Sequence, residues 1–308
     1  MTQKAAAPAS APSLPRSQVG NEPQYLLITL LGDYWFGREE LIPSAALVAL
    51  LAEFGVSESS SRQAMRRLAT RGLLVHERVG RTAYYGSRRN SSAVTAERLR
   101  RAVGFGSRYP DWDGKWTVVS FSVPEKARDV RRWLRNGLRS HKFGLLNDAI
   151  WVSPHDRVAD AEALLDRLGV ADASIMRAEL LPRASQPMSF SNVFELEQLG
   201  TDYLEFIDRH EPMVEVARSG RVTPSEALVL RTGLMSDWLS FRVKDPELPE
   251  SLLPADWPRR RAHEVFISIY DSVGATAESR FRQILGAVDP GLATLVTHHT
   301  TTNLRLDE

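Results

Sequence analysis

Apolar side chains recur every three or four residues in three neighbouring segments near the N-terminus. The first segment begins near Tyr25, the second follows Pro43, and the third begins at a serine cap, Ser57, and stops at Gly72. This spacing places the apolar residues of each segment on one helical face, and Ser and Gly are common helix boundaries. The sequence therefore predicts three short amphipathic helices in succession.

The third of these helices is followed by two β-rich runs, residues 73–78 and 82–85, on either side of a glycine turn. Such runs around a glycine predict a β-hairpin. Three helices and a hairpin in this order are typical of a winged helix-turn-helix, which we expect over residues 23–92. The preceding residues 1–22 are rich in Ala, Pro and Ser, and we expect a disordered tail there.

A second block alternates strand-like and helical patterns over residues 112–183. The expected order is β-α-β-β-α-β, the order of a ferredoxin-like domain, with strands at residues 115–123, 143–146, 149–153 and 173–180. The helix after the first strand is expected to bury an apolar face made of Val130, Trp133, Leu134 and Leu138. A linker helix over residues 93–111 is expected to join this domain to the winged helix.

From residue 184 to residue 290 the pattern is helical throughout. The longest predicted helix covers residues 226–243, with Thr223 or Ser225 as its cap. Residues 291–308 are expected to form a flexible tail. The chain is thus predicted to be an α+β protein with a winged helix-turn-helix, a ferredoxin-like middle domain and an all-helical C-terminal domain for effector binding and dimerisation.

Positive charge is concentrated in the predicted winged helix. Residues 56–101 contain eleven arginines against three glutamates, a local charge of about +8, whereas the whole chain carries only +1. A cationic surface on a near-neutral protein suggests a polyanionic partner. Double-stranded DNA is the most obvious one, because its phosphates favour clustered Arg through counterion release.

The outward face of the third helix and the hairpin carry the candidate DNA-binding residues, which are Ser59, Ser60, Arg62, Gln63, Arg66, Arg67, Arg71, Arg78 and Arg81. Arg pairs with guanine and Gln with adenine, so the base-facing residues are predicted to be Ser60, Arg62, Gln63 and Arg66. The remaining arginines are expected on phosphates or, at the wing tip, in the minor groove. The alternative is a solvated arginine-rich helix.

The composition narrows the function further. The chain has no cysteine, which excludes disulfides and thiolate metal sites. No apolar run approaches the roughly 18 residues that span a bilayer, so we expect a cytoplasmic protein without a membrane partner. The seven histidines lack the paired spacing of a metal site. No catalytic residue, metal ion or cofactor is predicted, and the protein is not expected to be an enzyme.

Three separated groups of segments carry a resemblance to a known family. The first comprises residues 29–33, 54–58, 67–73 and 78–85. The second comprises residues 112–116, 134–135, 143–145 and 150–154. The third, which is the most specific, comprises Pro-Ser-Glu-Ala-Leu-Val-Leu-Arg-Thr at residues 224–232 and the segments 244–249 and 252–258. In these segments the chain resembles the PaaX-like family of bacterial repressors, which is named for control of phenylacetic acid degradation.

The resemblance implies a homodimeric repressor that binds paired half-sites and is released from its operator by an aromatic acyl-CoA such as phenylacetyl-CoA. It also implies a middle domain similar to small CRISPR-associated ferredoxin-like nucleases. One departure concerns the helix after residue 232, where the family continues with a His-Glu-aromatic-Arg run. This chain has Met-Ser-Asp-Trp-Leu at residues 235–239 instead, so its effector can differ from the founding one.

An acyl-CoA effector would need cations for its phosphates and an apolar slot for its acyl group. The C-terminal region supplies both, and the candidate effector-binding residues are Arg231, Trp238, Phe241, Arg242, Lys244 and Trp257. The three arginines at residues 259–261 are a further source of charge or a solvated face. The alternative interpretation is that the two tryptophans are ordinary core residues and that the loop over residues 245–258 is a structural brace.

Two enzymatic functions are alternatives to a regulator. One is a CoA-ester-processing enzyme with an accessory winged helix, and the other is a metal-dependent nuclease that uses the ferredoxin-like domain. A nuclease of that kind needs a carboxylate at the end of the first strand to hold a metal ion. Here the strand ends in Ser120-Phe121-Ser122-Val123, and the next carboxylate is Glu125. We therefore expect a non-catalytic middle domain.

Overall fold

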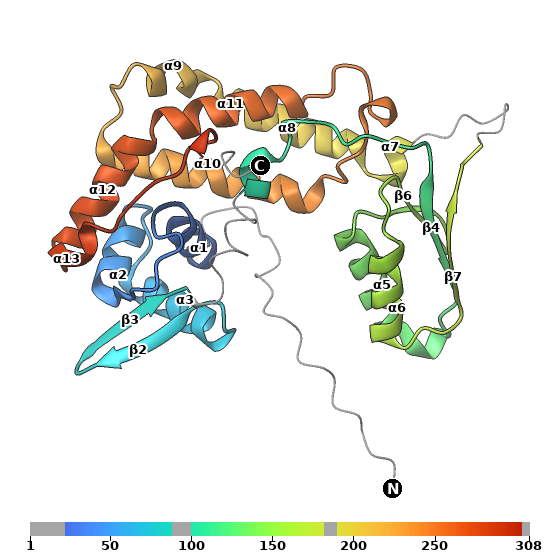
Figure 1. The fold of residues 1–308 in the computed structure, drawn as a ribbon, viewed down its shortest axis with the longest axis horizontal. Helices are drawn as coiled ribbons and strands as arrows, with labels where there is room; N and C mark the ends of the chain where they lie inside the picture. Colours follow the sequence, from blue (N-terminus) through green and yellow to red (C-terminus); the bar gives the residue numbers. More distant parts are fainter. Residues whose placement is uncertain (1–21, 88–99, 182–189, 304–308) are drawn as a thin grey trace, which may run out of the picture. The chain divides into compact units, whose positions relative to one another are not determined.

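The computed structural model describes residues 22–87, 100–181 and 190–303 (Figure 1). The chain divides into two compact units. The first contains residues 1–104, 210–240 and 264–308, and the second contains residues 105–209 and 241–263. The expected tail before residue 22 lies outside the described ranges, as do residues 93–99 of the expected linker helix. Of the remaining residues of that helix, 100–111, only 100–104 are helical, so the expected helix is too long at its C-terminal end. Within the described ranges no helix has both the length and the hydropathy to cross a bilayer.

The first unit begins with the predicted succession of helices and hairpin. Its elements are α1 (Pro23–Tyr34), β1 (Ile42–Pro43), α2 (Ser44–Ala52), α3 (Glu58–Thr70), β2 (Val75–Val79) and β3 (Thr82–Gly86). The three strands form an antiparallel sheet in the order β1-β3-β2. Strand β1 was not expected, because two residues are too few to show a strand period and their pairing with β3 is long-range.

Local chemistry explains where α3 begins and how the hairpin after it turns. The Oγ atom of Ser57 accepts a hydrogen bond from the backbone N–H of Ser60 at 3.3 Å, which confirms the predicted cap. Ala64, Met65 and Leu68 are buried beneath the helix. The turn of the hairpin contains Gly80 with a φ of +60°, a left-handed conformation that glycine adopts without strain.

Helices from the C-terminal part of the chain complete the first unit. They are α9 (Pro212–Arg218), α12 (Gly274–Gly286), α13 (Pro290–Ala293) and portions of α10 (Pro224–Lys244) and α11 (Arg259–Ser272). Helix α10 starts at a reciprocal cap, in which the hydroxyl and backbone N–H of Thr223 donate to Glu226 at 2.6 and 2.9 Å. The carboxylate of Glu53 at the end of α2 accepts from Ser225 at 2.5 Å and from Arg280 at 2.7 and 3.1 Å, and so ties α2 to α10 and α12.

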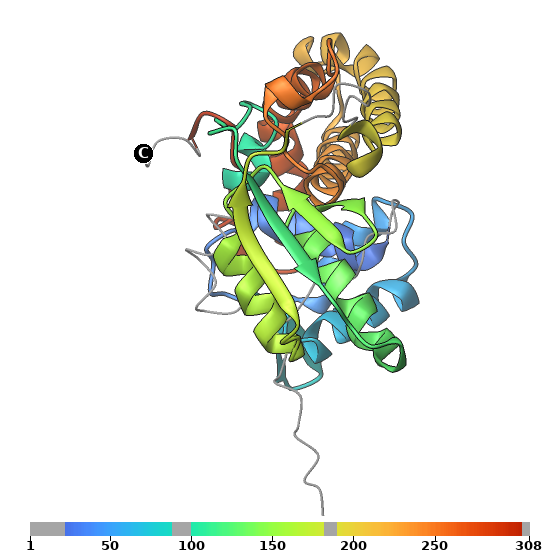
Figure 2. The same cartoon turned by 90° about the vertical axis from the view of Figure 1, so that its right-hand side faces the viewer.

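The second unit is built on a four-stranded antiparallel sheet. Its first elements are β4 (Trp116–Phe121), the short 3-10 helix η2 (Glu125–Ala127), α5 (Arg128–Ser140), β5 (Gly144–Asn147), β6 (Ile150–Ser153), α6 (Val158–Leu168) and β7 (Ala173–Ala178). The strand order is β5-β6-β4-β7. Helices α5 and α6 lie on one face of the sheet (Figures 1 and 2). This is the β-α-β-β-α-β order that the sequence predicts.

The predicted inward face of α5 is wrong at one position. Leu134 and Leu138 are buried as expected, but the side chain of Trp133 is 51% exposed. Gly137 explains the difference, since a Cβ atom there would come within 2.6 Å of Leu164 on α6. Close packing at this glycine fixes the rotation of α5, and the indole, one residue before Leu134, is turned by about 100° away from the core.

Two further helices and a long loop complete the second unit. These are α7 (Phe190–Val193), α8 (Leu196–His210, up to residue 209) and the loop over residues 245–258, which contains the 3-10 helix η3 (Glu250–Leu252). The loop is held firmly: Lys142 donates to the carbonyl of Asp245 at 2.7 Å, and the His155 ring bonds the carbonyl of Pro246 at 2.9 Å. These contacts favour the structural-brace interpretation of the loop.

The end of the chain departs from expectation. Residues 291–308 were expected to be a flexible tail, but residues 294–303 make defined contacts within the first unit. The backbone N–H of Thr297 donates to the carbonyl of Tyr34 at 3.3 Å, and Thr301 donates to Asp271 at 2.5 Å through its hydroxyl. Val296 is buried. The partners lie far away in the chain, so no local pattern announces this packing.

Candidate nucleic-acid interface

All nine predicted DNA-binding residues are exposed on α3, on the residue that comes directly after it, or on the hairpin. The apolar residues of α3 point the other way into the unit, with Leu68 wholly buried. The segment therefore has one polar and cationic side that is open to solvent. Figure 1 shows α3 and the β2–β3 hairpin as neighbours in the same part of the first unit.

The arginines of this surface differ in how they are held. Arg62 forms an ion pair with Glu58, one turn earlier, at 2.8 Å, and the Nε–H of Arg78 donates to the carbonyl of Gly80 at 3.1 Å. Among the described residues, neither Arg66 nor Arg67 forms an ion pair. The exposed Arg62–Glu58 pair contributes at most about 1 kcal/mol, so its guanidinium can exchange the carboxylate for DNA at little cost.

Val79 is part of the same surface and was missed by the sequence reasoning. It precedes the turn of the hairpin and its side chain is 66% exposed. Its register partner is Thr82, the pair that closes the hairpin. An apolar side chain at this tip can contact a sugar or a thymine methyl group. The signal available in the sequence was its position next to the glycine turn.

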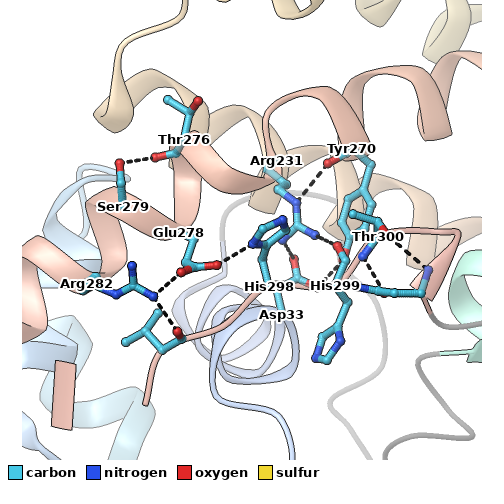
Figure 3. Close-up of polar contacts among 12 residues, drawn as sticks. Asp33, Arg231, Tyr270, Thr276, Glu278, Ser279, Arg282, His298, His299 and Thr300 are labelled. Atoms are coloured by element: carbon cyan, nitrogen blue, oxygen red, sulfur yellow. Dashed lines mark hydrogen bonds and ion pairs between the residues drawn. The ribbon is translucent and has the colours of Figure 1, made fainter. Parts of the chain in front are cut away.

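Arg231, which was predicted to bind the effector, lies in a buried polar cluster of the first unit (Figure 3). Its Nε–H donates to the carbonyl of Tyr270 at 3.1 Å and an Nη2–H to the carbonyl of His299 at 2.5 Å. Its Nη1 atom is 3.6 Å from the carboxylate of Asp33, and the guanidinium lies 3.7 Å above the Tyr270 ring. Burial raises the pKa of Asp33 despite the opposing charge of Arg231, and it raises the pKa of Tyr34 to about 12.

This cluster joins four segments that are distant in the sequence. Asp33 comes from α1, Arg231 from α10, Tyr270 from α11 and His299 from the C-terminal segment. The side chain of Arg231 has no exposed surface. A ligand would reach its guanidinium only by displacing groups of the protein. The arrangement is therefore suited to fastening the N-terminal helices to the C-terminal ones.

The other predicted effector residues are also held by the protein. Trp238 is fully buried in the first unit, stacks on Phe266 at 4.8 Å and donates its indole N–H to the carbonyl of Ala102 at 3.0 Å. In the second unit, Phe241 stacks on Tyr203 at 4.1 Å, and Trp257 meets the same ring edge-on at 6.1 Å.

The two cationic effector candidates of the second unit lie at the end of α10. Lys244 pairs with Asp202 at 2.6 Å, and the carbonyl of Arg242 accepts a hydrogen bond from Lys142 at 2.5 Å. Thus the structure brings Phe241 and Trp257 together around Tyr203, whereas Arg231 and Trp238 are interior residues of the other unit. That all six residues line a single effector-binding slot remains a prediction.

A buried ion pair in the second unit was not anticipated. Arg259, which was expected to be a solvated or ligand-binding cation, is 1% exposed and pairs with Asp245 at 3.1 Å. The same carboxylate accepts a hydrogen bond from the hydroxyl of Tyr203 at 2.6 Å. Burial, reinforced by the nearby carboxylate, raises the pKa of that tyrosine well above its usual value. Asp245 therefore fastens the loop to α8 and α11.

The described part of the chain contains no cluster of side chains that could hold a metal ion. Within residues 22–87, 100–181 and 190–303, no three His, Asp or Glu residues gather at metal-binding distance. A nuclease of the kind considered above needs a carboxylate at the end of β4. Here the backbone N–H of Ser122 donates to the carbonyl of Asp172, and the next carboxylate, Glu125 in η2, pairs with Arg128 at 3.3 Å.

Comparisons with known proteins agree with this organisation. Three family models match in chain order, described as PaaX-like protein (residues 22–87), PaaX protein central Cas2-like domain (109–188) and PaaX-like protein C-terminal domain (194–283). The transcriptional repressor PaaX of Escherichia coli strain K12 is 30% identical over 260 residues, which cover 82% of this chain and 80% of that protein.

A solved structure, the uncharacterized protein Rv0674 from Mycobacterium tuberculosis, resembles the chain with a TM-score of 0.55 at 21% identity. The similarity covers 86% of this chain and 99% of that one, and it concerns the fold alone. The three consecutive family matches and the 30% identity along most of both sequences decide the family. The chain belongs to the PaaX-like family.

Proposed function

We propose that this protein is a transcriptional repressor that binds double-stranded DNA through a winged helix-turn-helix made of α1, α2, α3 and the β2–β3 hairpin. The observation that carries the proposal is the exposure of all nine candidate residues on α3 and the hairpin, opposite a buried apolar face. The relative from Escherichia coli, which is named a transcriptional repressor, supports the same function.

The proposed reading mode is based on the length and polarity of α3. Its 13 residues span about 20 Å, enough for the N-terminal half to enter a major groove. Ser60, Gln63 and Arg66 would meet base edges, with Arg62 once it leaves Glu58. Arg67, Arg71, Arg78 and Arg81 would hold backbone phosphates, with the hairpin tip at the minor groove.

The regulation that we propose is based on the family resemblance. Two copies would bind paired half-sites, because a symmetric dimer presents its two reading helices at a fixed spacing. An aryl-acyl-CoA such as phenylacetyl-CoA would favour a dimer geometry that no longer matches this spacing, and so would release DNA of an aromatic-degradation operon. The different residues at positions 235–239 allow a different acyl group in this protein.

Selection of bound fragments from the DNA of the host organism tests the proposal directly. The purified full-length chain should recover a small set of promoters that share two half-sites, and the neighbouring genes would indicate the effector. Candidate acyl-CoA esters are then added to the protein–operator complex, and release is monitored by fluorescence anisotropy. Failure to enrich any shared sequence, even at low salt, would contradict the proposal.

A further inference from the structure

Helix α5 carries a second concentration of positive charge, outside the candidate interface on α3. Five of its 13 residues are arginines, namely Arg128, Arg131, Arg132, Arg135 and Arg139. At 100° per residue these five positions fall within an arc of about 100°, while Leu134 and Leu138 point into the core on another arc. We call this set of five residues the α5 arginine face.

The charge of this segment equals that of α3 and the hairpin tip, and is half of the +8 over residues 56–101. Residues 125–140 contain six cationic and two acidic side chains, a net charge of +4, and residues 58–81 contain six arginines and two glutamates, also +4. The whole chain carries +1, so the rest of the sequence has a net charge of −7. The protein thus concentrates positive charge in two places, and a polyanion is the partner that fits both.

Most of these arginines are available for a new partner. Arg128 pairs with Glu125 at 3.3 Å and Arg132 with Asp129 at 2.8 Å, and all four side chains are largely exposed. Such pairs are weak and readily exchanged. Arg135 is not buried either.

Two arginines of the face are partly structural. Arg131 donates to the carbonyl of Val123 at 2.5 Å, and the guanidinium of Arg139 lies 5.5 Å from the Trp151 ring centroid. These two positions anchor the helix, so substitutions there would disturb its packing as well as its charge.

The exposed indole of Trp133 lies beside the start of this face. It lines a shallow hollow of 780 Å³ whose wall contains two cations, Lys126 and Arg128, and two acids, Glu125 and Asp129, which pair with Arg128 and Arg132. An aromatic ring flanked by cations offers an apolar surface for a sugar and positive charge for the adjoining phosphates. Packing at Gly137 turns this tryptophan to solvent, and there it provides an apolar surface next to the arginines.

We propose that the α5 arginine face binds backbone phosphates of the operator DNA outside the bases read by α3. This inference rests on the proposed function. From Arg128 to Arg139 the face spans about 16 Å, which corresponds to about five phosphates of one strand at 3.4 Å each along the duplex axis. The neighbouring helix α6 offers little complementary charge to the same face of a second copy, since its exposed acids are Glu162 and Asp166, and its half-buried Asp160 already pairs with Arg157 at 3.1 Å.

The test compares full-length proteins on an operator fragment recovered by genomic selection. The triple variant Arg128→Gln, Arg132→Gln, Arg135→Gln removes three charges from the face. Loss of three phosphate contacts per subunit should reduce the slope of log K against log salt by about 2.7 for each bound subunit, so the fall in affinity between 50 and 200 mM salt becomes about 40-fold smaller per subunit. The hydroxyl-radical footprint should also lose protection outside the half-sites.

Two control proteins separate the loss of this contact from general effects. The variant Arg167→Gln, Arg218→Gln, Arg221→Gln removes the same charge from exposed positions elsewhere and should keep the parental slope. Lysine at the three α5 positions should largely restore the slope, because phosphate accepts a point charge. Restoration by lysine would show that positive charge at these positions, and not the arginine side chain itself, makes the contact.

The possible results separate the phosphate-binding role of α5 from the repressor function. A parental salt slope and footprint in the glutamine variant would overturn the role of α5 while leaving the repressor function intact. An unchanged slope accompanied by a lower mass in sedimentation would assign the face to a second copy instead, and would also overturn the inference. Absence of operator binding by the parental protein would remove the proposed function, and the α5 inference with it.

Discussion

Replacing Arg231 by methionine tests whether this buried arginine fastens the first unit together or serves a ligand. The side chain has no exposed surface, it donates to the carbonyls of Tyr270 and His299, and it lies 3.6 Å from Asp33. Methionine has a similar length and can fill the space, but it has no donor for the two carbonyls and no charge for the carboxylate. The variant therefore removes polar contacts with little change in volume.

The expected loss of stability is large. Removal of one member of a buried ion pair typically costs about 3–5 kcal/mol, because the remaining charge stays buried and uncompensated. The raised pKa of Asp33 lets that carboxyl take up a proton and recover part of the loss. We therefore expect the free energy of unfolding to fall by about 3 kcal/mol, which at a urea m-value of roughly 2 kcal/mol/M lowers the midpoint by about 1.5 M.

A double-mutant cycle refines this measurement. The partner variant Asp33→Asn and the combination of both changes should give a coupling energy of about 1–3 kcal/mol between the two residues. The control Arg218→Met alters an exposed arginine on α9 and should change stability by less than about 0.5 kcal/mol. An Arg231→Met protein that keeps parental stability but no longer responds to its effector would refute the structural role and restore the predicted ligand contact.

Two other changes test the packing. Glu53→Gln removes the ion pair to Arg280 and should cost about 1 kcal/mol at neutral pH. The hydrogen bonds from Arg280 lower the pKa of Glu53 in the folded state, so this contribution is present above pH 4.5 and is lost as pH falls through the folded pKa. The unfolding free energy of the variant should therefore decline less steeply on the acid side. Equal pH profiles would contradict this. Gly137→Ala forces a Cβ against buried Leu164 and should lower the free energy of unfolding by about 1–3 kcal/mol, despite the better helix propensity of alanine. A neutral or stabilising result in thermal unfolding would show that α5 can shift relative to α6.

The elements that the sequence predicts best are those whose signals are local. The cap at Ser57, the buried stripe of α3 and the glycine turn of the hairpin lie within about 25 residues, and each has a direct chemical meaning. The β-α-β-β-α-β order of the middle segment is similarly readable from strand-like and helical runs. For the same reason the exposed face of α3 could be assigned residue by residue.

The features that the sequence did not reveal depend on distant partners. Arginine is rarely buried, so the interior positions of Arg231 and Arg259 follow only from Asp33 and Asp245, which meet them through the fold. The exposure of Trp133 depends in the same way on close packing between α5 and α6. Such contacts have no period or motif, and for that reason the burial of Arg231 and Arg259 could not be predicted from the sequence.

The proposed division of roles between α3 and the hairpin tip is tested most directly by binding of Arg66→Ala and Arg81→Ala proteins to the operator and to a scrambled duplex of equal length. We predict that Arg66→Ala loses about 1–3 kcal/mol on the operator only, with relaxed preference at one base pair. Arg81→Ala should weaken both duplexes alike and reduce the salt slope by about 0.9 for each bound subunit. Equal losses on both duplexes for both variants would contradict base reading by α3.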